Sequence, residues 1–297
     1  MEWVAAPLRL SSMSRFRPSV QLAVLALVAL AATPPPASAM PEEEFDALMG
    51  ALRNGELAPV ETFLGQHEET TQADPEYYVV LLNYAVREAD QGSLVVARGE
   101  PAEGDYSLRD QKTGEVVGFM GHRTAWDEAL VVDAVQRTRA ALPAFQNRLD
   151  IHFGIVAVSE RIGRYDLVAD QIVTILETSR AIENAWIWGP IGSMHGEPRE
   201  FMIQNILPRT AAMFRSETPE ADRALERVSR SLIEHYPELV YGHMNLGLLA
   251  MIDQRYDEAH AHLERARALD PEDEIVLGNI RKLAELEAAS TRPARVD

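Results

Sequence analysis

The 297-residue chain has no cysteine. This absence excludes disulfide bonds, thiol catalysis, iron–sulfur clusters and zinc sites with thiolate ligands. Familiar chemical motifs are missing too: the sequence has no G-x-x-x-x-G-K phosphate loop, no G-x-G-x-x-G dinucleotide fingerprint and no H-E-x-x-H metal motif. We therefore expect no cofactor, no metal site and no enzymatic activity.

Positive charge is also scarce. The sequence has 28 lysine and arginine residues against 46 aspartate and glutamate residues, which gives a formal net charge of −18 at pH 7. Nucleic acids are bound by clustered lysine and arginine, and no basic run occurs beyond the N-terminal leader described below. We expect no nucleic-acid partner. Apolar residues make up 46% of the chain, which is enough for a packed core.

Long hydrophobic runs are rare, and the clearest one lies near the N-terminus at residues 20–32. Two arginines precede this run, and the small residues Ala37 and Ala39 follow it in the pattern that signal peptidase recognises. The run is shorter than the roughly 20 residues that a membrane span needs. These features predict a signal peptide at residues 1–39, removed after Ala39, and an exported protein that is periplasmic or secreted.

An uncleaved membrane anchor is the alternative interpretation of this leader. Met13 would open a more typical signal peptide than Met1, so the true start codon also stays open. No later stretch of the sequence is apolar enough to suggest a transmembrane segment.

A helical pattern with evenly spaced small residues occurs near the C-terminus, in a 34-residue unit at 240–273. Positions 7, 8, 17, 20, 24, 27 and 32 of this unit are Leu246, Gly247, Tyr256, Ala259, Leu263, Ala266 and Pro271. The small residues Gly247 and Ala259 permit two antiparallel helices to approach closely, and Pro271 ends the second helix. This pattern resembles the tetratricopeptide repeat, a helical hairpin that stacks on its neighbours.

Two further segments resemble degenerate copies of this unit. Residues 206–239 share its register one period earlier, and Thr218 before Pro219 is typical of a helix start. Residues 149–182 repeat the Arg-Tyr-Asp tripeptide of the best unit at an offset of 91 residues. Because 91 is not a multiple of 34, we expect an insertion in the aromatic and glycine-rich segment 183–205.

The expected fold class is all-α, an α-solenoid of tetratricopeptide-like helical hairpins with a small inserted β-hairpin. β-branched residues around a turn at 112–114 predict the β-hairpin. After the leader we expect a helical segment at 40–93, with divergent repeats as one interpretation, the β-hairpin at 94–121, helical hairpins at 122–182, the insertion at 183–205, repeats with a closing helix at 206–288, and a tail at 289–297.

The resemblance implies a peptide-binding groove lined by positions 2, 5, 9, 12 and 13 of each first helix. In the unit at 240–273 these positions are Tyr241, Met244, Leu248, Met251 and Ile252, all of them apolar. Such a groove suits a hydrophobic helix or peptide, because methionine adapts to varied shapes. The alternative is that the next helix, or the N-terminal half of the chain, already fills this surface.

The stretch 186–190, Trp-Ile-Trp-Gly-Pro, is the most unusual in the sequence. Trp186 and Trp188 are candidates for an aromatic ligand platform, although tryptophans near a loop more often fill the joint between two packed units. His260 and His262 lie two positions apart, so they point in different directions on a helix and cannot share one metal ion. We expect this histidine pair at the surface.

Together these features predict a non-enzymatic helical-repeat scaffold in the bacterial cell envelope, with a protein or peptide as its partner. The alternative is a small-ligand binder or an enzyme that uses the aromatic loop at 186–196 as a pocket wall. An enzyme needs ionisable side chains that converge in a cleft, and the candidates are Glu160, His195 and Arg199 beside Trp186. The oligomeric state and the identity of the partner stay open.

Overall fold

The computed structural model of the chain describes residues 40–67, 74–98, 100–101, 105–123, 125–189 and 194–290. All of these residues belong to the compact unit that spans Pro35–Asp297. The predicted signal peptide at 1–39 and most of the predicted tail at 289–297 lie outside the described residues.

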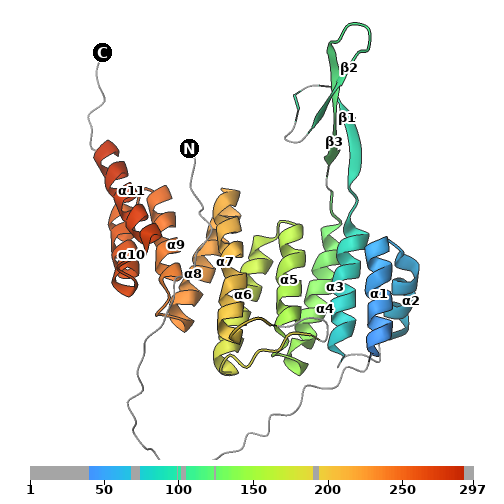
Figure 1. Cartoon of the computed structure of the whole chain (residues 1–297), viewed down its shortest axis with the longest axis horizontal. Coiled ribbons are helices and arrows are strands. Elements are labelled where there is room, and N and C mark those ends of the chain that lie inside the picture. The colour runs from blue at the N-terminus through green and yellow to red at the C-terminus, as the bar shows by residue number, and fades with distance from the viewer. Residues whose placement is uncertain are drawn as a thin grey trace, which may run out of the picture. The chain divides into compact units, whose positions relative to one another are not determined.

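Eleven α-helices follow one another along the described residues, and consecutive helices pack as hairpins (Figure 1). The five hairpins are α1 (Glu42–Asn54) with α2 (Leu57–His67), α3 (Pro75–Ala89) with α4 (Glu128–Ala141), α5 (Leu149–Arg161) with α6 (Tyr165–Ala181), α7 (Pro198–Ser216) with α8 (Pro219–His235), and α9 (Val240–Ile252) with α10 (Tyr256–Leu269). The closing helix α11 (Glu274–Ser290) packs on the last hairpin. The predicted helical-repeat fold is confirmed.

Local signals explain several helix boundaries. Asp74, Asp127 and Thr218 precede α3, α4 and α8, and each side chain accepts a hydrogen bond from a backbone N–H in the first turn of its helix. The helix start predicted at Thr218 therefore forms as expected. Helix α1 ends at Gly55, whose φ of +79° is in the left-handed region that glycine adopts without strain.

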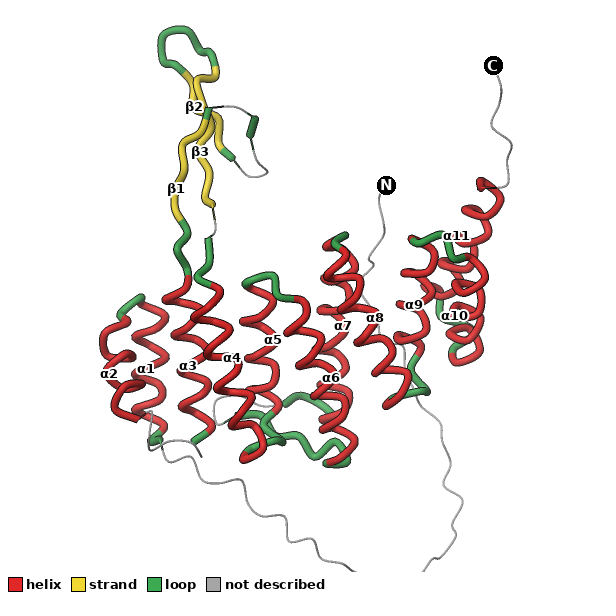
Figure 2. The backbone as a smooth tube through the Cα atoms, turned by 180° about the vertical axis from the view of Figure 1, so that it is seen from behind, coloured by secondary structure: helices red, strands yellow, loops and turns green. Residues whose placement is uncertain are grey.

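A small sheet interrupts the hairpin of α3 and α4, and Figures 1 and 2 show it standing away from the ends of these helices. It has three antiparallel strands in the order β1 (Ser93–Ala97), β3 (Val116–Arg123), β2 (Tyr106–Arg109). The predicted turn at 112–114 does join β2 to β3, with the Asp110 carboxylate accepting hydrogen bonds from the backbone N–H groups of Lys112 and Thr113. The insert is larger than a hairpin, because β1 pairs with the other edge of β3.

The link between α6 and α7 is shorter than the predicted insertion at 183–205, because α7 begins at Pro198. This link returns toward the start of α5, where the backbone N–H groups of Ile187 and Leu149 bond to the carbonyls of Asn147 and Ile187 at 2.9 and 3.0 Å. The link therefore forms part of the surface beside α5.

The contact between α9 and α10 is as close as the small residues predict. Ala259 and Ala266 are completely buried, and a Cβ atom built on Gly247 would lie only 2.8 Å from Cγ of Leu263. Gly242, whose role the sequence pattern did not indicate, permits the contact between α8 and α9 in the same way. Glycine is required at both positions because there is no room for a methyl group.

The buried apolar side chains form two large clusters that meet at α5. Ile151 and Ile155 of α5 pack with α1, α3 and α4 in the N-terminal cluster. Leu149, Phe153 and Val156, on the other face of α5, pack with α6, α7 and α8 in the second cluster. Smaller clusters join α9, α10 and α11. Helix α5 is thus buried on two faces and connects the two halves of the array.

Candidate functional site

One groove among the described residues lies between the first helices of the first three hairpins. It has a volume of about 510 Å³ and is lined by α1, α3, α5 and the link after α6. The lining residues are Phe45, Asp46, Met49, Arg53, Val79, Leu82, Asn83, Arg148, Asp150, Ile151, Gly154, Ala157, Val158, Trp188 and Gly189. We call this surface the α1–α3–α5 groove.

The α1–α3–α5 groove has an apolar floor and a polar rim. Phe45, Leu82 and Ile151 on its floor are buried and belong to the N-terminal core. Arg53 and Asn83 on its rim are exposed. An apolar floor with a few polar groups is typical of sites that bind peptides or small molecules.

A buried ion pair forms one end of this groove. Nη1 of Arg148 donates to Oε1 of Glu76 at 2.9 Å, and Nε and Nη2 donate to the two oxygens of Asp150 at 2.9 and 2.8 Å. The side chains of Arg148 and Glu76 are 7% and 2% exposed. Three of the guanidinium donors are therefore used within the protein. Through these bonds Arg148 links the start of α3 to the start of α5.

Gly189 passes directly over this ion pair. A Cβ atom built on Gly189 would lie 2.6 Å from Oδ2 of Asp150 and 2.7 Å from Nη2 of Arg148. Only glycine permits the link to approach so closely. Packing against the charged side chains of Arg148 and Asp150 therefore explains why residue 189 is a glycine.

The two predicted platform tryptophans have different environments. Trp186 is 3% exposed, its indole N–H donates to Oγ of Ser179 at 2.8 Å, and its ring contacts His152 edge-on. It fills a joint between helices, which leaves no face for a ligand. Trp188 is half-buried, lines the α1–α3–α5 groove and meets the ring of Phe201 at a centroid distance of 5.0 Å.

The groove residues predicted in the C-terminal unit are largely covered. Met251 is 3% exposed, and Ile252 is 50% exposed. Tyr241, Met244 and Leu248 are partly buried in clusters that include residues of the closing helix α11. Their role in partner binding stays a prediction, and the packing agrees with the alternative that the next helix fills this surface.

The side chains that an enzyme would need have partners in different places. Glu160 of α5 pairs with Arg209 of α7 at 3.5 Å, and burial raises the pKa of its carboxyl. Arg199 pairs with Glu238 and lies over the ring of Tyr236. The proposed convergence beside the aromatic loop is therefore not formed by these two groups.

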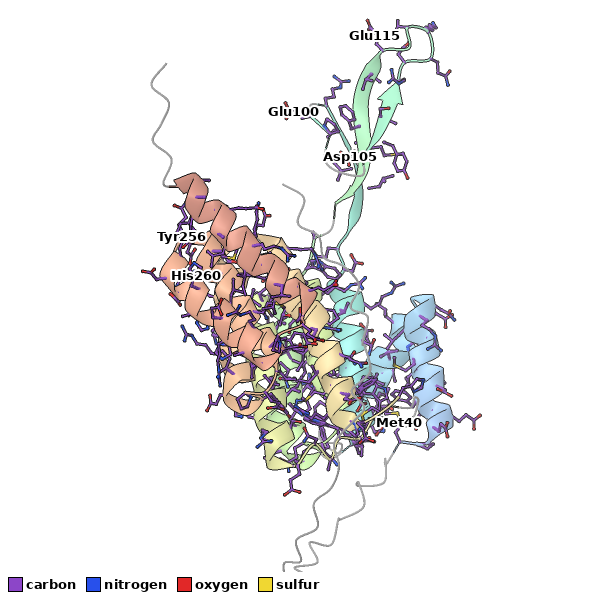
Figure 3. All side chains as sticks on the ribbon, turned by 60° about the vertical axis from the view of Figure 1, so that its left-hand side comes forward. Met40, Glu100, Asp105, Glu115, Tyr256 and His260 are labelled. Atoms are coloured by element: carbon purple, nitrogen blue, oxygen red, sulfur yellow. The ribbon has the colours of Figure 1, made fainter. Side chains whose placement is uncertain are left out.

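The neighbouring histidines of α10 also have separate partners. Nε2 of His260 lies 3.0 Å from the Glu287 carboxylate, whereas Nδ1 of His262 lies 3.0 Å from Nδ1 of His243. Figure 3 labels His260 on α10, near Tyr256. Within the described part of the chain, no group of three or more metal-ligating side chains is formed.

A second apolar surface lies on the sheet. Leu94, Val96 and Tyr106 are 66%, 62% and 73% exposed. Val96 and Tyr106 both pair with Met120 of β3, so their side chains share one face of the sheet. This face is exposed on an element that stands away from the helices, and Figure 3 shows side chains along the sheet on both sides of the ribbon.

The α1–α3–α5 groove was not predicted from the sequence, although the repeat pattern points to part of it. The offset of 91 residues between the copies carries Tyr241 and Leu248 onto Asp150 and Ala157, and both of these line the groove. The same offset carries Met244, Met251 and Ile252 onto Phe153, Glu160 and Arg161, which do not line the groove. The groove therefore matches the helix face that the repeat resemblance implies at two of its five positions. Nothing in the sequence pattern indicates the buried pair of Arg148 with Glu76.

Comparison with known proteins supports the repeat assignment. Residues 240–273 match the tetratricopeptide repeat family model. No curated protein matches the chain. Across the described ranges, no helix combines the length and apolar character of a membrane span. The chain therefore carries a tetratricopeptide repeat as the last hairpin of a helical-repeat array, an architecture that supports interaction with protein partners in general.

Proposed function

We propose that this chain is a non-enzymatic scaffold of the bacterial cell envelope that binds a peptide segment of a protein partner in the α1–α3–α5 groove. The observation that carries this proposal is the open groove on the first-helix face of three consecutive hairpins. Its apolar floor suits two or three apolar side chains of the peptide, and its rim offers hydrogen bonds to the peptide backbone. The groove at the C-terminal unit is a weaker candidate, because α11 packs against it.

The envelope assignment rests on the sequence of the leader. Residues 1–39 combine arginines, a short apolar run and small residues at Ala37 and Ala39, which is the pattern of a cleaved signal peptide. A cysteine-free chain also folds in an oxidising compartment without the risk of wrong disulfides.

Peptide binding in the groove is tested by substituting an arginine for an exposed residue of the groove wall. Ala157 is exposed and lines the groove, so Ala157→Arg should block the peptide without disturbing the core. Ala261→Arg on α10, also at an exposed helix position, is the matched control. Partners captured from an envelope fraction by wild type are identified, and the affinity of the purified partner for each variant is measured by calorimetry.

We expect Ala157→Arg to weaken binding at least tenfold, which corresponds to about 1.4 kcal/mol. Ala261→Arg should bind like wild type, and both variants should unfold at the wild-type temperature. Equal affinities of the two variants for the partner would remove the groove from the proposal.

A small-molecule ligand is the second candidate, because the half-buried Trp188 and Gly189 contribute to the groove wall. A volume of about 510 Å³ lies within the usual range for ligand pockets. A metabolite extract that raises the melting temperature of wild type, but not of Ala157→Arg, would favour this candidate over a peptide.

A further inference from the structure

Met40 is buried, although it would be the first residue of the processed chain. It follows Ala39 directly, so it is the first residue after the predicted cleavage site. Chain ends are usually poorly ordered unless they are held by packing. Met40 is only 6% exposed and belongs to the N-terminal core, beside the start of α1 (Figure 3).

The backbone nitrogen of Met40 faces a buried carboxyl group. Its N–H donates a hydrogen bond to the carboxylate of Asp74, which is 4% exposed. Burial raises the pKa of Asp74, and the neighbouring Glu76 carboxyl raises it further. Glu76 is 1% exposed. Two carboxyl groups therefore lie together away from water at the N-terminus of α3.

The charges around this pair are not balanced. Arg148 uses one nitrogen for Oε1 of Glu76 and two for Asp150. Oε2 of Glu76 is buried and has no hydrogen-bond partner among the described groups. The role of Asp74 as the cap of α3 accounts for its bond from the Glu76 N–H at 3.0 Å, but not for the orphan oxygen. The Asp74 and Glu76 side chains also share a hydrogen bond that raises the pKa of Asp74, so the two carboxyl groups hold a proton between them. Buried carboxylates are costly without a cation, and a second positive charge beside Arg148 would stabilise both in the ionised form.

We propose that removal of the leader after Ala39 creates this charge, and that the α-ammonium group of Met40 binds the buried Asp74 and Glu76 carboxyl groups as a latch on the first hairpins. In the precursor, the Met40 nitrogen is an amide with one donor and no charge. After cleavage it is an ammonium group with three donors and a positive charge, at the same place. The inference rests on the proposed export, because it needs the signal peptide to be removed.

The latch is tested with two chains that differ by one residue. Residues 40–297 begin with the ammonium group at Met40, whereas residues 39–297 begin at Ala39 and keep an amide at Met40, with the charge displaced by about 3.8 Å along the chain. Both chains contain every described core residue. Each is also made with Asp74→Asn, which keeps a capping oxygen but removes the charge.

We expect the unfolding equilibrium constant at pH 6 to be at least tenfold smaller for the Met40 chain than for the Ala39 chain, measured with urea. With Asp74→Asn this ratio should fall toward one, because only the Glu76 carboxyl is then left to bind the ammonium group. The ion pair raises the pKa of the ammonium group above its ordinary value of about 7.7, so below that pH the stability difference is fully present for as long as the Asp74 carboxyl stays ionised. It is lost as the pH rises through the raised pKa.

Three outcomes would overturn the proposal. The first is equal stability of the two chains, and the second is a difference that Asp74→Asn does not reduce or that does not change with pH. The third concerns the mature protein purified from the envelope fraction: its measured intact mass does not correspond to a chain that begins at Met40. Because the in-vitro ratio does not depend on export, an equal ratio in a correctly processed protein would refute the latch but leave the proposed function standing.

Discussion

His152 on α5 is held in one protonation state by its neighbours. Its Nε2–H donates to the carbonyl of Gln146 at 3.0 Å, and its Nδ1 accepts from Nε2 of Gln171 at 2.7 Å. This arrangement needs the neutral ring, because a protonated Nδ1 would face an N–H donor. Burial lowers the pKa of His152 to about 4.

The residue-scale prediction concerns acid stability. The folded pKa of His152, about 4, lies below the unfolded value of about 6.5, so the unfolded chain binds more protons between these pH values. This contribution to the free energy of unfolding is complete above pH 6.5 and is lost as the pH falls toward 4; it amounts to on the order of 3 kcal/mol.

Urea unfolding between pH 7 and pH 4 measures this slope. His152→Gln should have a flatter pH dependence than wild type, although it is less stable at pH 7. A variant slope as steep as that of wild type would show that other groups cause the acid sensitivity.

At the scale of the elements, the close packing of α9 against α10 depends on Gly247, because glycine has no side chain. Glycine in a helix interior normally costs about 1 kcal/mol relative to alanine. At Gly247 the preference of a helix interior for alanine is outweighed, because the added methyl group would meet the middle of the Leu263 side chain rather than its flexible end. Overpacking of this kind costs about 1–3 kcal/mol.

We expect Gly247→Ala to lower the free energy of unfolding by about 1 kcal/mol or more. Gly278→Ala on α11 is the matched control, since the nearest atom to its added Cβ is the end of Arg281 at 3.9 Å. This control should raise the free energy of unfolding by about 0.5–1 kcal/mol. Both variants are measured by urea titration. If Gly247→Ala also raised the free energy of unfolding, that result would contradict the close approach of α9 and α10.

At the scale of the whole array, the extensive helix contacts within the described residues join each hairpin to its neighbours along the chain. Leu283 of α11 is completely buried against α9 and α10. In the part of the chain that the structure describes, the extensive contacts of α11 are with these two helices. In such arrays stability is close to a sum of local terms, and one end can open while the other stays folded.

Leu283→Asp should therefore loosen the C-terminal hairpin alone. Hydrogen–deuterium exchange should show faster exchange in α9 and α10 and unchanged exchange in α1–α4, because a buried charge at Leu283 expels α11. Ile275→Asp, at a position on α11 that is 39% exposed, should leave the exchange pattern unchanged. Faster exchange over all helices would mean that the array unfolds as one unit.

The sequence predicted most helices because they depend on local rules. The unit at 240–273 was predictable from its small residues and its terminal proline, and the helix start at Thr218 from its capping chemistry. The third strand of the sheet was not predictable from a turn signal, because β1 joins the far edge of β3 rather than the turn. The insertion expected at 183–205 ends earlier in the structure, because α7 begins at Pro198.

By itself the sequence determined the helical-repeat architecture, the close contact at Gly247 and the acidic character of the chain. Only the tertiary structure decided where the open groove lies, that Trp186 is buried, and that Arg148 meets Glu76 across 72 positions of the chain. Small side chains and caps act through neighbours one or two turns away, so a sequence pattern records them. A groove and a buried ion pair depend on which helices stack, and that choice is made by packing over the whole core.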